Sequence, residues 1–243
     1  MKHALYSGTK NIYGDMQTAA KSLIANSDVD KVWMLTEGDY DCWLPDFCEV
    51  VDVSGQEFFP KTSPSMRTSY SYLALMRAAL ALMPELADVD RILSLDVDTI
   101  CVRSVSGVWD MPIDNCYFSA AQETATKIKN MLYCNTGVAL YNLEKLRDGK
   151  AEEVIYALNE RLYPNIEQDV FSFLCCGHIH DMPSEYNCTR FTRPTNIIRI
   201  EHFAGYKTED WRKRSIVDEY RKMSWDSVLE LHERAIKKAR NGK

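Results

Sequence analysis

Apolar segments of strand length alternate with helix-length segments through most of this chain. The strand-like segments are short apolar runs, and apolar residues at helical spacing mark most of the segments between them. The expected strands are residues 3–6, 31–35, 49–53, 91–95, 117–121 and 137–141, and the expected helices are 16–25, 70–83, 152–163 and 168–176. Strands that alternate with helices form a mostly parallel sheet covered on both faces. The sequence therefore predicts an α/β, Rossmann-like domain with a mostly parallel mixed sheet flanked by helices.

No repeat, low-complexity segment or linker divides the 243 residues. We therefore expect one domain over residues 1–211 and a helical tail over 212–243 packed on it. The tail has a narrow apolar stripe and a basic end, which also fits contact with a membrane. Acidic residues in the same region favour packing on the domain instead.

Charge and cysteine usage limit the class of protein. The net charge of −6, from 29 basic and 35 acidic residues, argues against a nucleic-acid partner. We expect no transmembrane helix and no signal peptide, because no apolar window of about 18 residues occurs and the N-terminus lacks an apolar core. The eight cysteines are scattered without a Cys-x-x-Cys pair. Reduced thiols and a cytoplasmic location are the expectation.

Two carboxylates follow the strand expected at residues 91–95. On extended backbone, Asp96 and Asp98 project to the same side, and two like charges this close favour a cation between them. Hard divalent metals take oxygen ligands, and ligands bind beyond the carboxyl ends of strands in such sheets. An acidic turn is the plain structural alternative. A dehalogenase-like phosphatase with Asp96 as nucleophile is a second alternative, although Thr99 stands one place too early for that pattern.

Four segments, in this order, resemble glycosyltransferase family 8, the group of glycogenin and the bacterial lipopolysaccharide galactosyl- and glucosyltransferases. They are residues 72–99, with Arg77 and Asp96-Val97-Asp98; 133–143, with Asn135-Thr136-Gly137; 167–171, with Glu167-Gln168-Asp169; and 202–207, with His202, Gly205 and Lys207. Residues 7–13 are a looser match to the family's uridine-binding loop. The likeness runs over roughly residues 3–211.

The resemblance implies a GT-A fold, a UDP-sugar donor, Mn²⁺ and transfer with retention at the anomeric carbon. It also implies that Asp96, Asp98 and His202 hold the metal. Carboxylates suit Mg²⁺ as well as Mn²⁺, and one imidazole favours Mn²⁺. The metal would neutralise charge on the departing UDP.

The same resemblance assigns the remaining candidate residues. The residues expected to contact the donor nucleotide are Thr9, Asn11, Tyr13, Arg77, Val97, Gly205 and Lys207. Gln168, Asp169 and Asn135 are expected at the reacting face of the sugar. A neutral amide is a poor nucleophile, so Gln168 favours front-face attack. An ion pair for Arg77, a helix N-terminus for Asp169 and a core position for Tyr13 are the structural alternatives.

The chain departs from the family pattern at several places. Glu167 stands where the family has Asp, Thr208 replaces Pro, and either Gln122 or Glu123 fills the acidic position after the strand at 117–121. The usual Asp of the N-terminal loop is missing. The expected function is transfer of a hexose from UDP-hexose to a hydroxyl of a glycan, lipid-linked saccharide or other acceptor. A non-catalytic nucleotide-sugar-binding protein is the remaining alternative.

Overall fold

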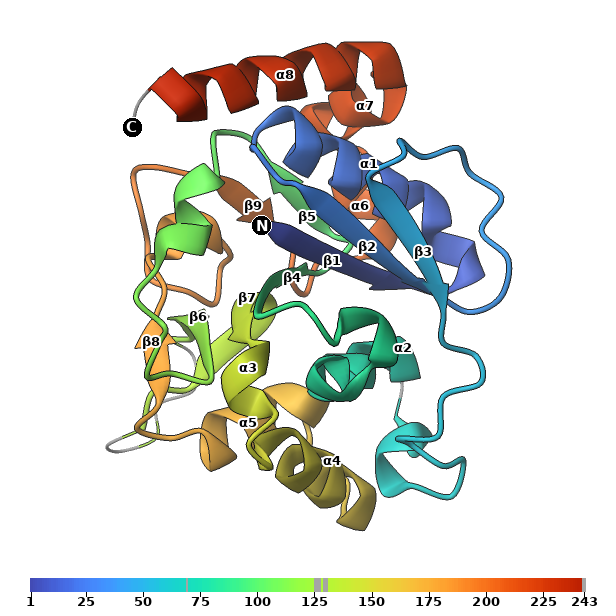
Figure 1. The fold of residues 1–243 in the computed structure, drawn as a ribbon, viewed down its shortest axis with the longest axis vertical. Helices are drawn as coiled ribbons and strands as arrows, with labels where there is room; N and C mark the ends of the chain where they lie inside the picture. The colour runs from blue at the N-terminus through green and yellow to red at the C-terminus, as the bar shows by residue number, and fades with distance from the viewer. Residues whose placement is uncertain (69, 125–127, 129–130, 242–243) are drawn as a thin grey trace.

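A mixed, seven-stranded sheet forms the centre of the computed structural model, which describes residues 1–68, 70–124, 128 and 131–241 (Figure 1). Its strands are β1 (His3–Gly8), β2 (Lys31–Thr36), β3 (Cys48–Asp52), β4 (Arg91–Leu95), β6 (Phe118–Gln122), β7 (Cys134–Asn142) and β8 (Ile179–Asp181). Their order is β3-β2-β1-β4-β7-β6-β8. β7 is antiparallel to β4 and β6, and the other neighbouring pairs are parallel. The mostly parallel mixed sheet predicted from the sequence is confirmed.

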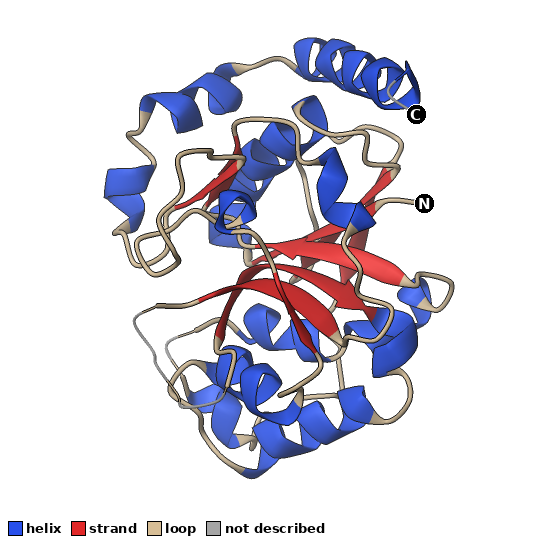
Figure 2. Ribbon diagram, turned by 90° about the vertical axis from the view of Figure 1, so that its left-hand side faces the viewer, coloured by secondary structure: helices blue, strands red, loops and turns tan. Residues whose placement is uncertain are grey.

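Helices cover both faces of this sheet (Figure 2). One face carries α1 (Tyr13–Ala25), α6 (Thr208–Trp211), α7 (Ser215–Lys222), α8 (Trp225–Asn241) and a small sheet of β5 (Thr99–Cys101) and β9 (Ile200–His202). The other carries α2 (Tyr72–Leu75), α3 (Leu143–Leu146), α4 (Lys150–Glu160) and α5 (Ile166–Leu174). Alternate side chains of a strand point to opposite faces, so Tyr6 packs in the first layer and Leu5 in the second. The predicted α/β class is confirmed.

The prediction of one continuous helix over residues 70–83 is wrong. α2 ends after one turn, and 3-10 turns follow at Met76–Ala78 and Leu80–Leu82. Met83 is extended, with ψ 128°, because it precedes a proline. Most side chains of this segment are buried, so packing overrides helix propensity. Other 3-10 turns cover Lys10–Ile12, Pro64–Arg67, Pro84–Leu86, Ser106–Asp110 and Ser184–Tyr186.

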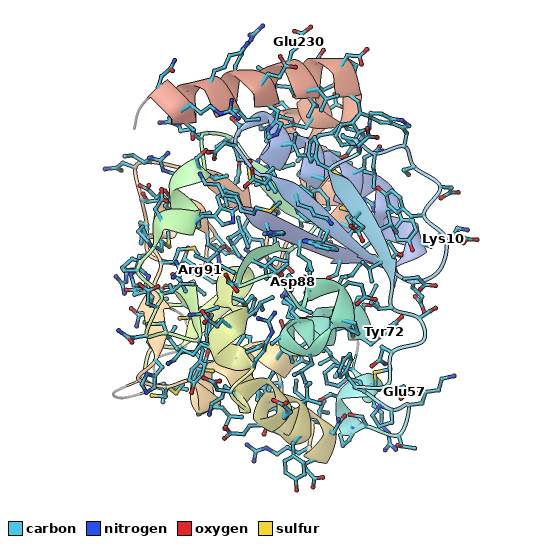
Figure 3. All side chains as sticks on the ribbon, in the orientation of Figure 1. Lys10, Glu57, Tyr72, Asp88, Arg91 and Glu230 are labelled. Carbon is cyan, nitrogen blue, oxygen red and sulfur yellow. The ribbon has the colours of Figure 1, made fainter. Side chains whose placement is uncertain are left out.

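The C-terminal helices lie against α1. Lys21 of α1 donates from Nζ to the carbonyl of Met223 at 2.7 Å, and the buried imidazole of His232 lies 2.8 Å from the carbonyl oxygen of Ser27. The opposite side of α8 carries exposed side chains such as Glu230 (Figure 3). The division into 1–211 and 212–243 stays a prediction, and residues 242–243 lie outside the described part. None of the helices in the described part of the chain combines the length and the apolar character that crossing a membrane requires.

The two sheets together bring distant parts of the chain to one place. β4 ends at Leu95, and the amide of Asp96 donates to the carbonyl of Gly137 on β7 at 2.7 Å. β5 then pairs antiparallel with β9, which puts Thr99 opposite His202. The polar residues after β4 therefore lie beside the end of β9.

Candidate active site

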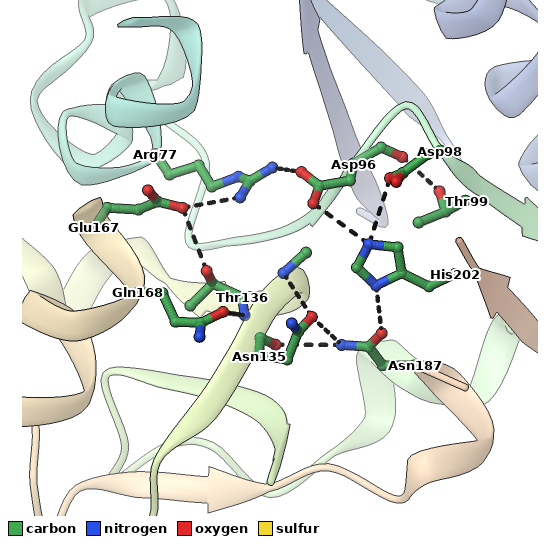
Figure 4. Close-up of polar contacts among 11 residues, drawn as sticks. Arg77, Asp96, Asp98, Thr99, Asn135, Thr136, Glu167, Gln168, Asn187 and His202 are labelled. Atoms are coloured by element: carbon green, nitrogen blue, oxygen red, sulfur yellow. Dashed lines mark hydrogen bonds and ion pairs between the residues drawn. The ribbon is translucent and has the colours of Figure 1, made fainter. Parts of the chain in front are cut away.

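The carboxylates of Asp96 and Asp98 and the imidazole of His202 converge at the end of β4 (Figure 4). His202 Nε2 lies 3.5 Å from Asp96 Oδ2 and 3.3 Å from Asp98 Oδ1. One ligand atom from each residue lies within 4.8 Å of the others. The acidic pair and the distant histidine are thus close enough to share one cation.

Backbone hydrogen bonds fix this convergence. Phe203 donates its amide to the carbonyl of Asp98 at 2.9 Å, next to the β5–β9 pairing. Thr99 Oγ1 donates to the carbonyl of Asp96 at 2.6 Å and closes the turn between β4 and β5. The positions of Asp96, Asp98 and His202 are therefore set by the ends of β4, β5 and β9.

Gly137 makes room for the cluster. A Cβ built on this residue would lie 2.6 Å from Asp96 Oδ2 and 2.9 Å from His202 Nε2, shorter than real Cβ contacts allow. Its φ is not positive, unlike that of Gly205, so the backbone would accept another residue. Gly137 is required here for space and not for its conformation.

Arg77 links the acidic pair to α5. Its guanidinium, 5% exposed, forms an ion pair with Asp96 and lies 3.0 Å from Glu167 Oε1. Burial acts to raise the pKa of the Asp96 carboxyl, but Arg77 and His202 outweigh it and hold this pKa well below its usual range. Burial raises the pKa of Glu167 to about 7, with Arg77 opposing the shift. Arg77 thus forms the ion pair that was its structural alternative, and it does so with one of the candidate metal ligands.

The two neighbouring carboxylates change the pKa of His202. Burial acts to lower its pKa, but Asp98 and Asp96 outweigh burial and raise the pKa to about 9. A histidine that ligates a metal is neutral, so a bound cation would displace the proton from Nε2. Two carboxylates and one neutral imidazole are a donor set that suits Mn²⁺, and the residues present fit the expected metal.

A cleft of about 480 Å³ opens over the cluster. The candidate residues that line it are Arg77, Asp96, Asp98, Asn135, Gln168, His202 and Gly205. A second cleft of about 300 Å³ shares Arg77, Asp96 and Asp98 and extends past Val97 to Gly8 and Ile12. The two clefts meet at Asp96 and Asp98, so a ligand that spans both clefts would pass over the candidate cation site.

Gln168 lines the first cleft, and three hydrogen bonds hold its side-chain amide. Its Oε1 accepts from the amide of Thr136 at 3.2 Å, and its Nε2 donates to Glu123 at 3.1 Å and to the Tyr133 hydroxyl at 3.0 Å. Glu123 also lines the cleft, whereas Gln122 binds Arg193. Of the two residues considered for the acidic position, Glu123 is the one that faces the site.

Five candidate residues lie off both clefts. Asp169 accepts from the Tyr133 hydroxyl at 2.5 Å, and its Oδ2 accepts from the amide of Asn165 at 3.0 Å. Tyr13 is buried with its hydroxyl 3.1 Å from the carbonyl of Glu37. Thr9 Oγ1 contacts Asn11 Oδ1 at 2.5 Å, and Lys207 is exposed at the start of α6. Their roles toward the nucleotide and sugar stay predictions.

The sequence reasoning missed several residues that line the first cleft or hold its side chains. They are Tyr70, Asn165, Ile166, Asn187 and Phe191. Asn187 is fully buried and lies 2.8 Å from His202 Nδ1. Four of these residues come from loops and turns with no periodic pattern, and Ile166 begins α5, so no sequence signal marks them as part of the site.

Comparison with the sequence models of known protein families identifies the family of this chain. Residues 40–215 match the sequence model described as Glycosyl transferase family 8, which is more than half of the chain. The chain belongs to glycosyl transferase family 8. The resemblance seen in the four sequence segments is confirmed.

Relatives of this family 8 chain agree with the assignment. A Haemophilus influenzae protein, provisionally named a glycosyltransferase, is 26% identical over 183 residues, which are 64% of this chain and 52% of the relative. The chain thus spans about half the length of that curated protein.

Solved structures establish the fold of the family 8 chain. The galactosyltransferase LgtC, in complex with donor and acceptor sugar analogs, superposes with a TM-score of 0.68 at 17% identity, covering 96% of this chain and 95% of that one. The glycosyltransferase GlyE of Streptococcus pneumoniae TIGR4 gives a TM-score of 0.66 at 18% identity, covering 97% and 64%. The predicted GT-A fold is confirmed.

Proposed function

We propose that this family 8 chain is a retaining, Mn²⁺-dependent hexosyltransferase that moves a hexose from a UDP-hexose to an acceptor hydroxyl. The observation that carries the proposal is the convergence of Asp96, Asp98 and His202 where two clefts meet. The second cleft would take the nucleoside and the first the sugar, with the diphosphate between them at the acidic pair.

The metal supplies charge neutralisation for the departing diphosphate when it is bound. Asp96, Asp98 and His202 would hold it, and Arg77 keeps the carboxylate of Asp96 charged and oriented. Mg²⁺ could satisfy the two carboxylates, but the imidazole favours Mn²⁺. These residues orient the leaving group and do not react covalently.

The sugar would lie over Gln168. The bond between the anomeric carbon and the UDP oxygen breaks, the acceptor oxygen bonds to that carbon from the same face, and the acceptor proton passes to the departing phosphate oxygen. Three hydrogen bonds fix the amide of Gln168, which supports a role for its dipole in stabilising positive charge at the anomeric carbon. Asn135 lines the same cleft, which supports a role in binding the sugar.

Glu167 adds an acceptor for a sugar hydroxyl. It lines the first cleft, it is 3% exposed, and its Oε2 has no hydrogen-bond partner among the described residues. A buried carboxylate oxygen without a partner is costly, and because this one has almost no accessible surface, a sugar hydroxyl would satisfy it once the side chain turns toward the cleft. This supports a polyhydroxylated donor in the first cleft.

The alternatives have less support. A phosphatase that uses Asp96 as nucleophile needs no histidine at the acidic pair, and the chain matches a glycosyltransferase family instead. A non-catalytic binding protein has no need of the rigid Gln168 arrangement. The acceptor would be a glycan, lipid-linked saccharide or other hydroxyl compound, and the chain would act in the cytoplasm.

A screen of UDP release over several UDP-hexoses tests the proposal. Each donor is incubated with the protein and Mn²⁺, Mg²⁺ or no divalent metal, beside an Asp98→Asn variant. We expect metal-stimulated UDP release from one donor, reduced at least roughly 100-fold in the variant because a metal ligand is lost. No metal-stimulated turnover and no binding of any UDP-sugar would refute the proposal.

A further inference from the structure

Asn187 is a buried polar residue that belongs to none of the segments resembling the family. It follows the 3-10 turn Ser184–Tyr186, is 0% exposed, and lies directly behind the imidazole of His202 (Figure 4). Its Oδ1 is 2.8 Å from His202 Nδ1, the ring nitrogen on the side away from the two carboxylates.

The neighbours of Asn187 fix which way its amide points. Nδ2 lies 3.2 Å from the backbone carbonyl oxygen of Asn135 and 3.0 Å from Asn135 Oδ1. A backbone carbonyl only accepts hydrogen bonds, so the nitrogen of the amide must face Asn135. The oxygen of the amide therefore faces His202.

This orientation determines the tautomer of the histidine. An amide oxygen cannot donate, so His202 Nδ1 must carry the hydrogen. In the neutral ring the lone pair is then on Nε2, the atom that faces Asp96 and Asp98. The outer hydrogen-bond partner of a ligating histidine commonly sets its tautomer and ring orientation in this way.

The backbone around Asn187 is itself held in place. Its carbonyl accepts from Thr192 Oγ1 at 2.7 Å, and its amide donates to the carbonyl of Ser184 at 3.1 Å. The next residue, Cys188, pairs with β9 on both sides of Glu201: its amide donates to the carbonyl of Ile200 and its carbonyl accepts from the amide of His202, each at 3.0 Å. Asn187 thus has little freedom to turn away from the ring.

We propose that Asn187 is the positioning residue of the metal site: it holds His202 as the Nδ1–H tautomer, with Nε2 presented to the cation, and ties this ligand to Asn135 at the sugar cleft. The inference rests on the metal site of the proposed function. Loss of such an outer partner typically weakens metal binding roughly 10- to 100-fold.

Calorimetric titration of the full chain with Mn²⁺ tests the inference through binding and not turnover. Asn187→Leu removes both hydrogen-bonding ends and keeps the branched shape of the side chain, and it should bind Mn²⁺ roughly 10- to 100-fold more weakly. Asn187→Asp keeps an acceptor for Nδ1–H but loses the donor to Asn135, so it should recover most of the affinity while staying less stable than the wild type.

Asn142→Leu is the matched control. Asn142 is also a buried asparagine, 4% exposed, and it bonds the carbonyl of Ile113 and the amide of Lys145 at the far end of β7. We expect this variant to lose stability and keep the Mn²⁺ affinity of the wild type. Loss of affinity in the control as large as in Asn187→Leu would overturn the inference.

Nitrogen-15 NMR of the wild-type imidazoles gives a readout that does not depend on the folding of either Asn187 variant. With diamagnetic Cd²⁺ bound, the His202 ring should carry its proton on Nδ1, and a His202→Asn spectrum assigns the signal. A proton on Nε2, or equal Mn²⁺ affinity in the wild type and both Asn187 variants, would overturn the inference about Asn187 and leave the proposed function standing. If the wild type binds no Mn²⁺, both the inference and the proposed function are wrong.

Discussion

A methyl group at Gly137 would occupy the space of two candidate metal ligands, Asp96 and His202. The Cβ of a Gly137→Ala variant would lie 2.6 Å from Asp96 Oδ2 and 2.9 Å from His202 Nε2. Comfortable contacts with carbon begin at about 3.5 Å, so one or both side chains must move by roughly 1 Å. Neither can retreat freely, because Arg77 holds Asp96 and Asn187 holds His202.

The expected cost follows from this displacement. A shift of about 1 Å in a reacting geometry lowers turnover roughly 100-fold, and overpacking lowers the free energy of unfolding by about 1–3 kcal/mol. The assays are kcat/KM for the active UDP-hexose, Mn²⁺ affinity by calorimetry and urea unfolding. Gly14→Ala on α1 is the control, since its Cβ meets nothing within 4 Å, and alanine should leave activity unchanged. Wild-type activity and metal affinity in Gly137→Ala would refute the placement of the site.

Two further predictions concern the residues around the acidic pair. Arg77→Met leaves Asp96 and Glu167 without their partner and should lower the free energy of unfolding by about 3 kcal/mol. This value is near the small end for a buried ion pair because Asp96 is partly exposed. Urea unfolding measures the loss, and a double variant with Glu167→Gln that recovers no stability would contradict the prediction. Gln168→Ala should keep the Mn²⁺ and UDP affinities of the wild type while kcat falls roughly 100-fold; steady-state kinetics measure this, and an unchanged kcat would remove Gln168 from the reaction.

Local patterns in the sequence were enough to predict the sheet. The apolar runs at 31–35 and 91–95 became β2 and β4 with nearly the same bounds, since buried strands are apolar along their whole length. The helix at 70–83 failed for the opposite reason. Its residues are apolar on every side, so the period that marks a helix is absent and tertiary packing decides the backbone.

The approach of His202 to Asp98 was not predictable from local patterns. It depends on the pairing of β5 with β9, two strands of three residues each from distant parts of the chain. Only the resemblance to the family put the histidine with the aspartates. Asn187 has no counterpart in any quoted motif, and its role follows from hydrogen bonds that only the folded chain creates.

Pulsed electron paramagnetic resonance of bound Mn²⁺ tests whether the acidic pair and the histidine share one cation. The experiment detects a ligating nitrogen through its coupling to the unpaired electrons of the metal. The wild-type protein with Mn²⁺ and UDP should show coupling to one imidazole nitrogen, which His202→Asn should abolish. A Mn²⁺ ion coordinated by oxygen alone in the wild type, or coupling that persists in His202→Asn, would contradict the account.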